Sequence, residues 1–396
     1  MRYCKRCVYP ENARPHIYFD EEGICSGCRS FEARTSLRNQ IDWDRRWTDL
    51  RILLDEYAQR QREKGNPYDC IIPVSGGKDS HYQVHVVKEK LGFQPLLVSY
   101  NHAFNTSLGL RNLANLVHRS NCNLVRFSTP PDTAIRLAKF MLGKVGDVTW
   151  HYHAGIMTFP IQAAVQYDVP LIVWGEEGFS ELVGMHNFDD QVEFTKKKRQ
   201  EHSMRGFEPE DLLADPQCPL TKYELAPFFY PADDIIERVG VRGVYLSNYI
   251  PWDARTQTEF VIKEMGFASA TQRDRTFNIY AKTDCLFANG LHDWLKFLKF
   301  GYGRATDDAS NEVRHGRMSR YEAVGLVKRY DHVRPSDLNW FLEKTGMTEV
   351  EVRAAVEPMK DHDGDAVWKH ETRYAGYGEP FLPTPNAMPI EPGPIL

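Results

Sequence analysis

The stretch from Tyr68 to His81, YDCIIPVSGGKDSH, contains residues whose types and spacing could bind a phosphate. Asp69 to Val74 is short and mostly apolar, which predicts a strand buried on both faces. Gly76 and Gly77 allow positive φ and let a ligand approach the backbone closely. A helix expected from His81 to about Leu91 would direct its N-terminal N–H groups at the same spot. An ordinary turn between strand and helix is the alternative, but the full string favours nucleotide binding.

A second set of reactive residues lies at the N-terminus. Cys4-x-x-Cys7 and Cys25-x-x-Cys28 are two CxxC pairs separated by 17 residues. Each pair can direct two thiolates at one ion and together they complete a tetrahedron, which predicts a zinc ribbon over residues 1–32. An iron–sulfur cluster or unligated core cysteines are the alternatives. Because four thiolates leave no open position on zinc, we expect a structural role.

Polar residues also follow two predicted strands at their carboxyl ends, where doubly wound sheets bind ligands. Asn101 and His102 follow the strand Pro95–Tyr100, and Gly175, Glu176 and Glu177 follow the strand Pro170–Trp174. We expect Glu176 to handle magnesium or substrate. The alternative is a pair of solvated loop acids.

The stretch Lys299–Arg320, KFGYGRATDDASNEVRHGRMSR, has charged residues between glycines and no helical periodicity at its start. This composition predicts a loop that binds an anionic group, whereas the alternative is a surface loop with salt bridges of little functional value. The candidate ligand-binding residues are Arg304, Asp307, Asp308, Arg314 and Arg317.

Strands and helices alternate around these residues, which predicts an α/β fold with a doubly wound, mostly parallel sheet. A further strand is expected at Val241–Tyr249, and helices are expected at Leu108–Ser120, Asp132–Leu142, His153–Tyr167, Thr256–Met265 and Asp284–Phe300. The predicted organisation is a ribbon (1–32), a helical connector (33–67), a nucleotide-binding domain (68–265) with an irregular insertion near 180–230, a helical substrate-binding extension (266–356) and a Pro-rich tail (357–396).

Composition restricts the functional class. The chain has 396 residues, a formal net charge of −5 and no apolar run long enough for a membrane span, and its start lacks the apolar stretch of a signal peptide. We expect a cytoplasmic protein that binds neither membrane nor nucleic acid. The basic run Lys196–Arg199 is interpreted as a solvated helical face.

The string SGGKDS resembles the PP-loop of ATP pyrophosphatases, which hold the β- and γ-phosphates of ATP and cut between the α- and β-phosphates. Together with YCKRCVYP, CSGC, SYNHAFNT, WGEEG, YLSNYIPWD and LHDWLKFLKFGYGRATDDAS, it makes the chain, up to about Asp331, resemble the N-acetyl sugar amidotransferases of bacterial surface-polysaccharide and LPS O-antigen biosynthesis. The fold implied is of the PP-loop, adenine nucleotide alpha hydrolase type.

This resemblance implies a reaction and a set of site residues. ATP adenylates an acetamido oxygen on a nucleotide-activated or nonulosonic sugar, and ammonia displaces AMP to leave an acetamidino group. Lys78, Asp79 and Glu176 would be catalytic, and the cofactors would be ATP, Mg²⁺ and structural Zn²⁺. The ATP-binding residues implied are Ser75, Gly76, Gly77, Lys78, Asp79, Ser80, Asn101 and Gly175, and the sugar-binding candidates are His102, Arg304, Asp307 and Arg314.

The resemblance also implies partners. Cys25 fits the G-x-C-x-G pattern of a glutaminase nucleophile by letter, but it pairs with Cys28 as an expected zinc ligand, and Cys70, Cys122, Cys218 and Cys285 lack such surroundings. Ammonia would therefore come from a separate glutaminase through a barrel-like conduit, similar to the two parts of imidazole glycerol phosphate synthase. The nearest alternative is a PP-loop enzyme that thiolates tRNA, which would normally need a basic RNA-binding face. A non-catalytic ATP-binding scaffold is a second alternative.

Overall fold

One parallel sheet organises the molecule. The computed structural model describes residues 1–37, 41–178, 184–185, 191–199, 204, 206–280, 286–362 and 380–394. Within that part of the chain, the strands are β1 (Cys70–Pro73), β2 (Pro95–Asn101), β3 (Leu124–Ser128), β4 (Leu171–Trp174) and β5 (Arg242–Tyr245), and they pair in the order β3-β2-β1-β4-β5. The predicted doubly wound fold is confirmed. Because the strand order reverses between β1 and β4, the carboxyl ends of these two strands border the crevice where such sheets bind ligands.

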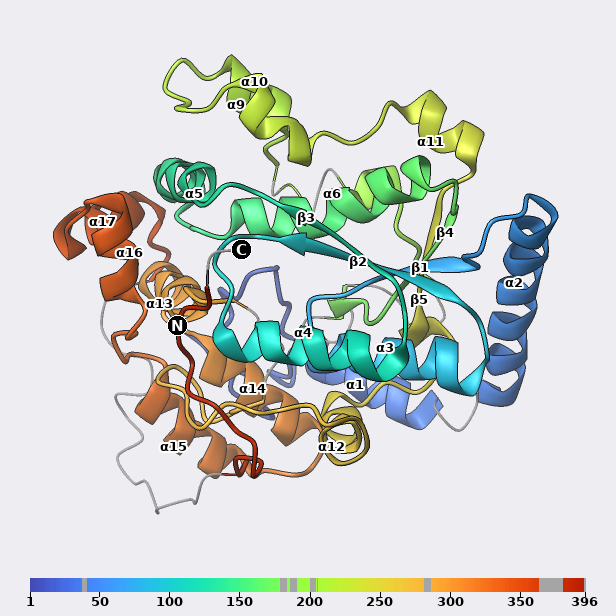
Figure 1. The fold of residues 1–396 in the computed structure, drawn as a ribbon. Helices are drawn as coiled ribbons and strands as arrows, with labels where there is room; N and C mark the ends of the chain where they lie inside the picture. Colours follow the sequence, from blue (N-terminus) through green and yellow to red (C-terminus); the bar gives the residue numbers. More distant parts are fainter. Residues whose placement is uncertain are drawn as a thin grey trace.

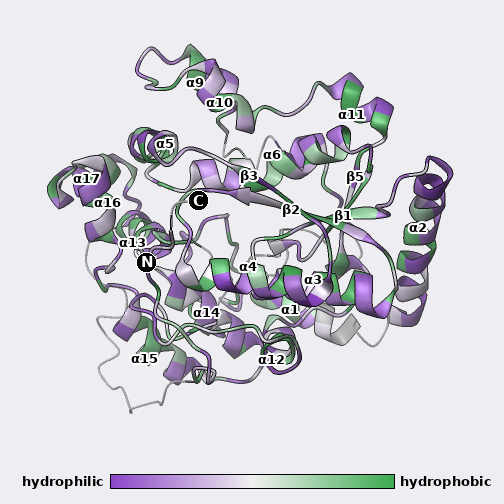
Figure 2. Cartoon of the chain, in the orientation of Figure 1, coloured by the Kyte–Doolittle hydropathy of each residue, from purple (hydrophilic) through white to green (hydrophobic). Residues whose placement is uncertain are grey.

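Helices cover both faces of the sheet (Figure 1). One face carries α2 (Trp43–Glu63), α3 (Lys78–Val84) with its π-helical continuation η1 (His85–Lys90), and α4 (Ser107–Ser120), while the other carries α5 (Pro131–Val145) and α6 (Trp150–Gln166). Successive side chains of β1 alternate between two cores: Ile72 packs with the α2 side and Ile71 with the α6 side. The strands are therefore apolar on both faces. The helices around them alternate hydrophilic and hydrophobic positions along their length (Figure 2).

The chain after the sheet forms a helical region. It contains α12 (Ala254–Met265), α13 (Asn289–Phe300), α14 (Arg304–Arg314), α15 (Arg320–Tyr330), α16 (Leu338–Thr345), α17 (Glu349–Val356) and the 3₁₀ turn η5 (Glu357–Met359). The predicted loop at Lys299–Arg320 is wrong in its centre, because α14 is a helix. Its buried residues are small (Ala305, Thr306, Ala309 and Ser310) or charged (Asp307, Glu312 and Arg314), so no run of large apolar residues revealed the helical period. The predicted helix start at Asp284 lies outside the described residues.

The N-terminal ribbon does not stand apart from this region. The Tyr9 hydroxyl donates to Asp307 Oδ1 of α14 at 2.8 Å, and the Tyr302 hydroxyl donates to Arg14 O at 3.0 Å. Tyr9 and Tyr302 share one buried cluster with the four N-terminal cysteines. The last ribbon cysteine, Cys28, lies within α1 (Ser26–Leu37), which also contacts α14. The N-terminal ribbon therefore packs against the helical region that follows the sheet, although the two are far apart in the sequence.

The insertion near 180–230 contains short helices in its described part: α8 (Lys196–Lys198), α9 (Pro209–Ala214), α10 (Lys222–Leu225) and the 3₁₀ turn η3 (Ala226–Phe228). Beyond it, α11 (Asp233–Val239) leads into β5, and the predicted strand Val241–Tyr249 ends early in the 3₁₀ turn η4 (Leu246–Asn248). No helix in the described part of the chain combines the length and the apolar composition needed to cross a lipid bilayer.

The C-terminal tail returns across the body of the protein (red in Figure 1). Met388 forms a bridge with Ala270, and Pro392 forms a bridge with Thr106 at the start of α4. The Gly393 N–H donates to Asn105 O at 2.6 Å. The described tail residues 380–394 are thus anchored beside the carboxyl end of β2.

Candidate functional site

The loop after β1 has the predicted strand–turn–helix form. The Ser75 N–H donates to Ser80 Oγ at 3.0 Å, and the Gly77 N–H donates to Ser75 Oγ at 3.3 Å. The two serine hydroxyls therefore shape the turn from inside. Gly77 has φ −69° and serves as the N-cap of α3, so of the two predicted glycines only Gly76, at φ +86°, uses the left-handed region.

Gly76 is also required by close packing. A Cβ at this position would lie 2.7 Å from both Gly109 O and Leu113 N of α4, which are backbone atoms that cannot move aside easily. His81 fixes the same loop from the other side: its Nδ1 lies 2.9 Å from Gly77 O, and burial lowers its pKa to about 4. A neutral His81 with its proton on Nδ1 satisfies this bond. Sequence reasoning missed this residue, although it follows the motif directly.

Lys78 lies at the first position of α3 and is 4% exposed. Its Nζ is paired with Asp79 Oδ1 at 2.5 Å. Gln83, one turn further on, connects this helix to the end of β4. With its amide oriented to satisfy both groups, it donates to Asp79 O at 3.2 Å and accepts from the Gly175 N–H at 2.5 Å. The predicted residues Asp79 and Gly175 are thus joined by a side chain that the motif does not include.

The structure brings five of the predicted site residues, Lys78, Glu176, Arg304, Asp307 and Asp308, into one cavity of about 90 Å³, which we call the Lys78 cavity. Lys78 and Glu176 come from the ends of β1 and β4, whereas Arg304 and Asp307 come from α14. More than 200 residues of sequence separate Lys78 from Arg304. The cavity therefore joins the loop after β1 to the helical region.

Charges on α14 are arranged in pairs around this cavity. Arg304 Nη2 lies 3.0 Å from Asp293 Oδ1, and Asp307 Oδ2 lies 2.6 Å from Lys296 Nζ. Burial alone would lower the pKa of Arg304, but the nearby carboxylates, Asp293 first, hold it above its ordinary value. Burial raises the pKa of Asp308, which also lines the cavity, to about 6. The cavity thus contains a carboxyl group whose pKa is held above its ordinary value by burial.

The predicted binding residues that do not line this cavity include His102, Asn101 and Arg314. His102 is 3% exposed, and burial, followed by the neighbouring His151, holds its pKa well below the ordinary value. Asn101 is 1% exposed and donates to Ser128 Oγ at 2.9 Å. Arg314 points to the cysteines, with its Nη2 3.7 Å from Cys25 Sγ. We therefore no longer expect Arg314 to bind the sugar.

The loop after β4 holds its two glutamates differently. Glu176 is partly exposed and lines the Lys78 cavity. Glu177 is 5% exposed and forms an ion pair with Lys198, whose ammonium also lies 4.8 Å from the Tyr245 ring centroid. The prediction of a solvated face for Lys196–Arg199 is wrong for Lys198 and Arg199, which are 9% and 8% exposed. The buried Lys198 explains how the insertion holds this loop in place.

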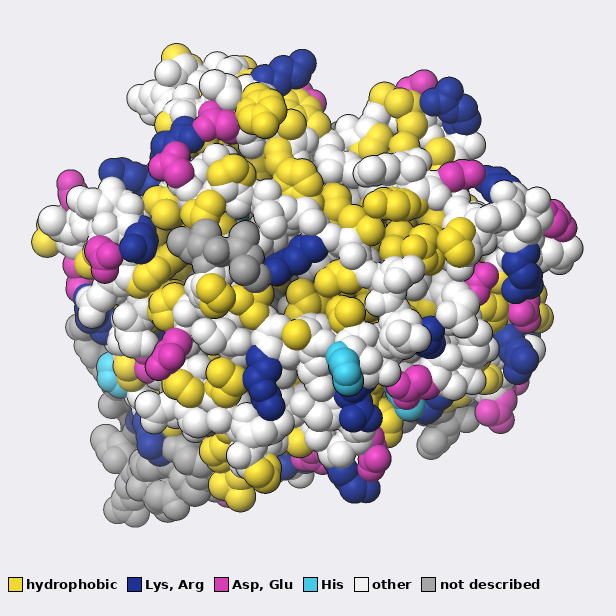
Figure 3. Space-filling model, in the orientation of Figure 1, with side chains coloured by type: hydrophobic (Ala, Val, Ile, Leu, Met, Phe, Trp, Pro, Cys, Tyr) yellow, Lys and Arg dark blue, Asp and Glu magenta, His cyan; other side chains and the backbone are white. Residues whose placement is uncertain are grey.

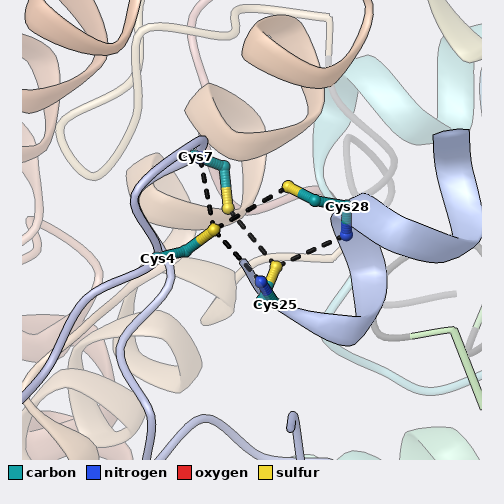
Figure 4. Close-up of side chains that lie close together, drawn as sticks. All are labelled: Cys4, Cys7, Cys25 and Cys28. Atoms are coloured by element: carbon teal, nitrogen blue, oxygen red, sulfur yellow. Dashed lines mark hydrogen bonds between the residues drawn. The ribbon is translucent and has the colours of Figure 1, made fainter. Parts of the chain in front are cut away.

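The four N-terminal cysteines form one buried cluster (Figure 4). All four are 0% exposed, and their Sγ atoms lie within 4.8 Å of one another. Cys7 Sγ is 3.6 Å from Cys25 Sγ, and Cys4 Sγ is 4.0 Å from Cys28 Sγ. Tetrahedral zinc with Zn–S bonds of about 2.3 Å requires sulfur atoms roughly 3.8 Å apart. The spacing fits a single zinc ion, because a cluster of several irons would hold its thiolates further apart.

Backbone N–H groups and arginines surround these sulfur atoms. The Cys25 N–H donates to Cys4 Sγ at 3.3 Å, and the Cys28 N–H donates to Cys25 Sγ at 3.4 Å. Arg320 Nε donates to Cys4 O and Cys7 O at 3.2 and 3.1 Å. These donors would offset the negative charge of four thiolates and orient them. Zinc held here supplies structural cross-linking and leaves no coordination position for a reaction.

Comparison with solved structures finds weak similarity over long stretches. An NMN synthetase from Francisella tularensis is 14% identical, with 56% of this chain and 92% of that chain covered and a TM-score of 0.28. The U34-tRNA thiolase NcsA from Methanococcus maripaludis, solved with its [4Fe-4S] cluster, is 10% identical, with 90% and 97% covered and a TM-score of 0.33.

Comparison with curated proteins and family models is more informative. The uncharacterized protein MJ1599 of Methanocaldococcus jannaschii is 24% identical over 122 residues, which are 31% of this chain. The match spans only 41% of that protein's length. Residues 256–376, which include the whole of α14, match the family described as LPS biosynthesis protein WbpG-like, C-terminal domain. The predicted relationship to surface-polysaccharide enzymes is confirmed to this extent: residues 256–376 are similar to the WbpG-like family of LPS biosynthesis proteins.

Proposed function

We propose that this protein is an ATP-dependent amidotransferase of glycan biosynthesis. It would convert an acetamido group of a nucleotide-activated or nonulosonic sugar to an acetamidino group, with AMP and pyrophosphate as by-products. The observation that carries the proposal is the Lys78 cavity, where a phosphate-binding loop faces the WbpG-like helix α14. A site built from both parts suits the transfer of a nucleotide group to a sugar.

The chemistry proceeds in two steps. The acetamido oxygen attacks the α-phosphorus of ATP, the bond to the β-phosphate oxygen breaks, and pyrophosphate leaves. This forms an O-adenylyl imidate, in which the poor electrophile has gained a good leaving group. Ammonia then attacks the imidate carbon, the carbon–oxygen bond breaks with loss of AMP, and proton loss from the added nitrogen completes the amidine.

The residues of the chain would act mainly by position and charge. In this proposal the Ser75–Ser80 loop holds the phosphates, and Lys78 neutralises charge that develops on pyrophosphate. Asp79 and Glu176 offer carboxylates where Mg²⁺ would bind, and such an ion supplies charge neutralisation between phosphate oxygens. Arg304 and Asp307 would contact the sugar from α14.

We propose that ammonia reaches this site from separate partners, a glutaminase and a barrel-like conduit. Supporting this, no cysteine in the described part of the chain lines the Lys78 cavity. Cys70 lies within β1 and is 0% exposed, and burial raises the pKa of its thiol. A buried neutral thiol is a poor nucleophile for hydrolysing glutamine.

That no described cysteine lines the Lys78 cavity also weighs against tRNA thiolation, which often uses a reactive cysteine pair. Charge also disfavours RNA on the face shown in Figure 3, where Lys and Arg side chains are interspersed with acidic and uncharged ones. A sequence-independent RNA interface needs a more continuous basic surface.

The test is an ATP–pyrophosphate exchange assay with candidate nucleotide sugars and, in parallel, with tRNA. We expect exchange to depend on the sugar and to be lost in Lys78→Ala. Mass spectrometry of the complete reaction with ammonium chloride should show a carbonyl oxygen replaced by NH. Exchange that responds to tRNA alone, or release of ADP, would refute the proposal.

The proposed ammonia source has its own test. At neutral pH most free ammonia is ammonium, so activity of the chain alone with ammonium salts should rise steeply from about pH 7 to about pH 9. Glutamine should support the reaction only after the glutaminase and conduit proteins are added. Glutamine-dependent amidine formation by this chain alone would contradict the proposal that a separate glutaminase supplies the ammonia.

A further inference from the structure

Three carboxylates of α14 line the Lys78 cavity: Asp307, Asp308 and Glu312. Two of them are held in ion pairs. Asp307 Oδ2 lies 2.6 Å from Lys296 Nζ, and Glu312 Oε2 lies 2.8 Å from Arg255 Nη1. A carboxylate paired with a cation is a weak proton acceptor, because its negative charge is already stabilised. Asp308 is the carboxylate of this helix that differs.

Asp308 is bonded to a neutral group. Its Oδ2 accepts the Thr276 hydroxyl at 2.5 Å, and in the described part of the chain the carboxylate forms no ion pair. The residue is only partly buried, and its Oδ1 is not enclosed by protein, so this oxygen is accessible from the cavity. Asp308 therefore presents one fixed oxygen and one open oxygen, which suits a group that receives a proton.

The proposed reaction requires such a group in its second step. When ammonia attacks the imidate carbon, the added nitrogen carries a positive charge. In that state ammonia is a better leaving group than AMP, so the adduct would return to its starting materials. Removing one proton from the added nitrogen prevents this return. A positioned base for such a transfer typically contributes about 10²- to about 10⁴-fold in rate.

We propose that Asp308 is the general base of the second step and accepts a proton from the nitrogen that ammonia adds. This inference rests on the proposed function, because it assigns the proton transfer of that reaction. The N–H bond breaks and an O–H bond forms at Asp308 Oδ1. The nitrogen lone pair then forms a carbon–nitrogen double bond, the carbon–oxygen bond breaks, and AMP leaves with its electrons. Asp308 releases the proton to solvent afterwards.

The groups that serve the two steps come from different elements. Lys78 and Glu176 reach the cavity from the ends of β1 and β4, whereas Asp308 reaches it from α14. The departure of pyrophosphate in the first step does not need a proton acceptor at Asp308. Adenylation and amidine formation should therefore be separable by mutation of this residue.

The surroundings of Asp308 predict the pH range of its action. Burial raises its pKa to about 6, Arg304 and the Thr276 hydroxyl act to lower it, and Asp307 and Asp293 act to raise it. Further titratable groups around it are Arg273 and the cavity residues Lys78, Glu176, Arg255, Tyr280, Glu312 and His315. Because only the ionised carboxylate can accept the proton, amidine formation at constant free ammonia should rise as the pH increases through about 6.

The experiment compares the two half-reactions in the full chain. Pyrophosphate exchange reports adenylation, and mass spectrometry reports amidine formed from ammonium chloride, with UDP-linked mono- and diacetamido sugars as substrates. Asp308→Asn keeps an oxygen for the Thr276 hydroxyl but cannot accept the proton. We expect exchange within about threefold of wild type and amidine formation lower by about 10²-fold or more. The adenylated sugar should then hydrolyse, so that AMP forms without amidine.

Thr276 provides a second pair of variants. Thr276→Val removes the donor to Asp308, which should raise the pKa of Asp308 and move the rise in amidine formation to higher pH. Thr276→Ser keeps the hydroxyl and should keep the wild-type profile. Asp42→Asn, at the N-cap of α2, removes a carboxylate that does not line the cavity and should match the wild type in both half-reactions. The thermal midpoint of each variant shows whether the fold is kept.

The outcomes separate this inference from the proposed function. Asp308→Asn with wild-type amidine formation overturns the inference and leaves the function standing. Exchange that falls as far as amidine formation also overturns it, because Asp308 would then serve adenylation as a metal ligand or sugar contact. A Thr276→Val pH profile identical to that of the wild type contradicts it as well. If the wild type shows exchange with none of these sugars, the proposed function fails and the inference fails with it.

Discussion

Replacement of Lys78 should lower the rate of turnover while the fold stays intact. It lines the Lys78 cavity at the first position of α3, where its charge would meet the leaving pyrophosphate. Lys78→Ala should lower kcat by about 10²–10³, as expected for the loss of one preorganised group. Steady-state assays of AMP formation, with thermal melting to confirm the fold, measure this.

Lys88 provides the matched control on the same helical segment. Its ammonium donates to Gln94 at 2.9 Å, and it does not line the cavity. Lys88→Ala should keep wild-type kcat. A Lys78→Ala variant with nearly normal kcat would remove the phosphate role from this loop.

Arg304 and Arg314 should respond in opposite ways to substitution by lysine. Arg304 lines the cavity, so Arg304→Lys should raise KM for the sugar more than KM for ATP, because lysine cannot reproduce a bidentate guanidinium contact. Arg314 lies against Cys25, so Arg314→Lys should speed zinc loss to a chelator and leave both KM values near wild type. Equal effects of both variants on sugar KM would show that we have placed Arg314 wrongly.

At the scale of elements, Gly76 shows how the turn depends on α4. Both Gly76 and Gly92 have left-handed backbones, with φ of +86° and +82°. A Cβ at Gly92 meets nothing within 4 Å, whereas a Cβ at Gly76 meets α4 backbone at 2.7 Å. Gly92→Ala should therefore cost only the conformational strain, about 1–2 kcal/mol.

Gly76→Ala should cost clearly more than Gly92→Ala, because it adds a backbone clash to the same strain. It should also weaken ATP binding, since the loop must shift away from α4. Denaturant unfolding of the two variants gives the comparison. Equal losses in the free energy of unfolding would mean that the loop adjusts without strain.

The sequence predicts the sheet well and the helical region less well, for physical reasons. Strands such as Pro95–Asn101 are buried on both faces, so their apolar runs are unambiguous. In α14 the buried residues are Ala, Thr and Ser together with charged residues, and two of its charged residues pair with α13, so the segment has the composition of a loop.

Site residues at the ends of the strands could likewise be predicted better than those in the helical region. Lys78 and Glu176 could be predicted because parallel strand ends meet at one edge of a sheet. The surroundings of Arg314 could not be predicted, because Cys25 lies 289 positions earlier and only the fold shows which charge Arg314 faces.

At the scale of the whole molecule, the two ends of the chain both support the candidate site. The ribbon reaches the Lys78 cavity through the Tyr9–Asp307 hydrogen bond, and the tail reaches it through Phe381, which lines the cavity and lies 5.0 Å from the Arg255 guanidinium. The Ser75–Ser80 loop is shaped by hydrogen bonds between its own residues. Damage to the ribbon should therefore affect the sugar side of the site before the ATP side.

The double variant Cys4→Ser/Cys25→Ser tests this order. It should lose the one zinc per chain that elemental analysis of the wild type is expected to find, because two remaining thiolates cannot hold the ion in a closed site. Without zinc the Tyr9 and Arg320 contacts lose their support, so α14 should loosen and KM for the sugar should rise several-fold. ATP affinity should change less, because β1, α3 and α4 form the loop's own support.

Cys218→Ser, outside the cluster, should retain zinc and both KM values. An iron–sulfur absorption spectrum in anaerobically purified protein, or an ATP affinity that falls as far as the sugar affinity, would contradict this account of the ribbon.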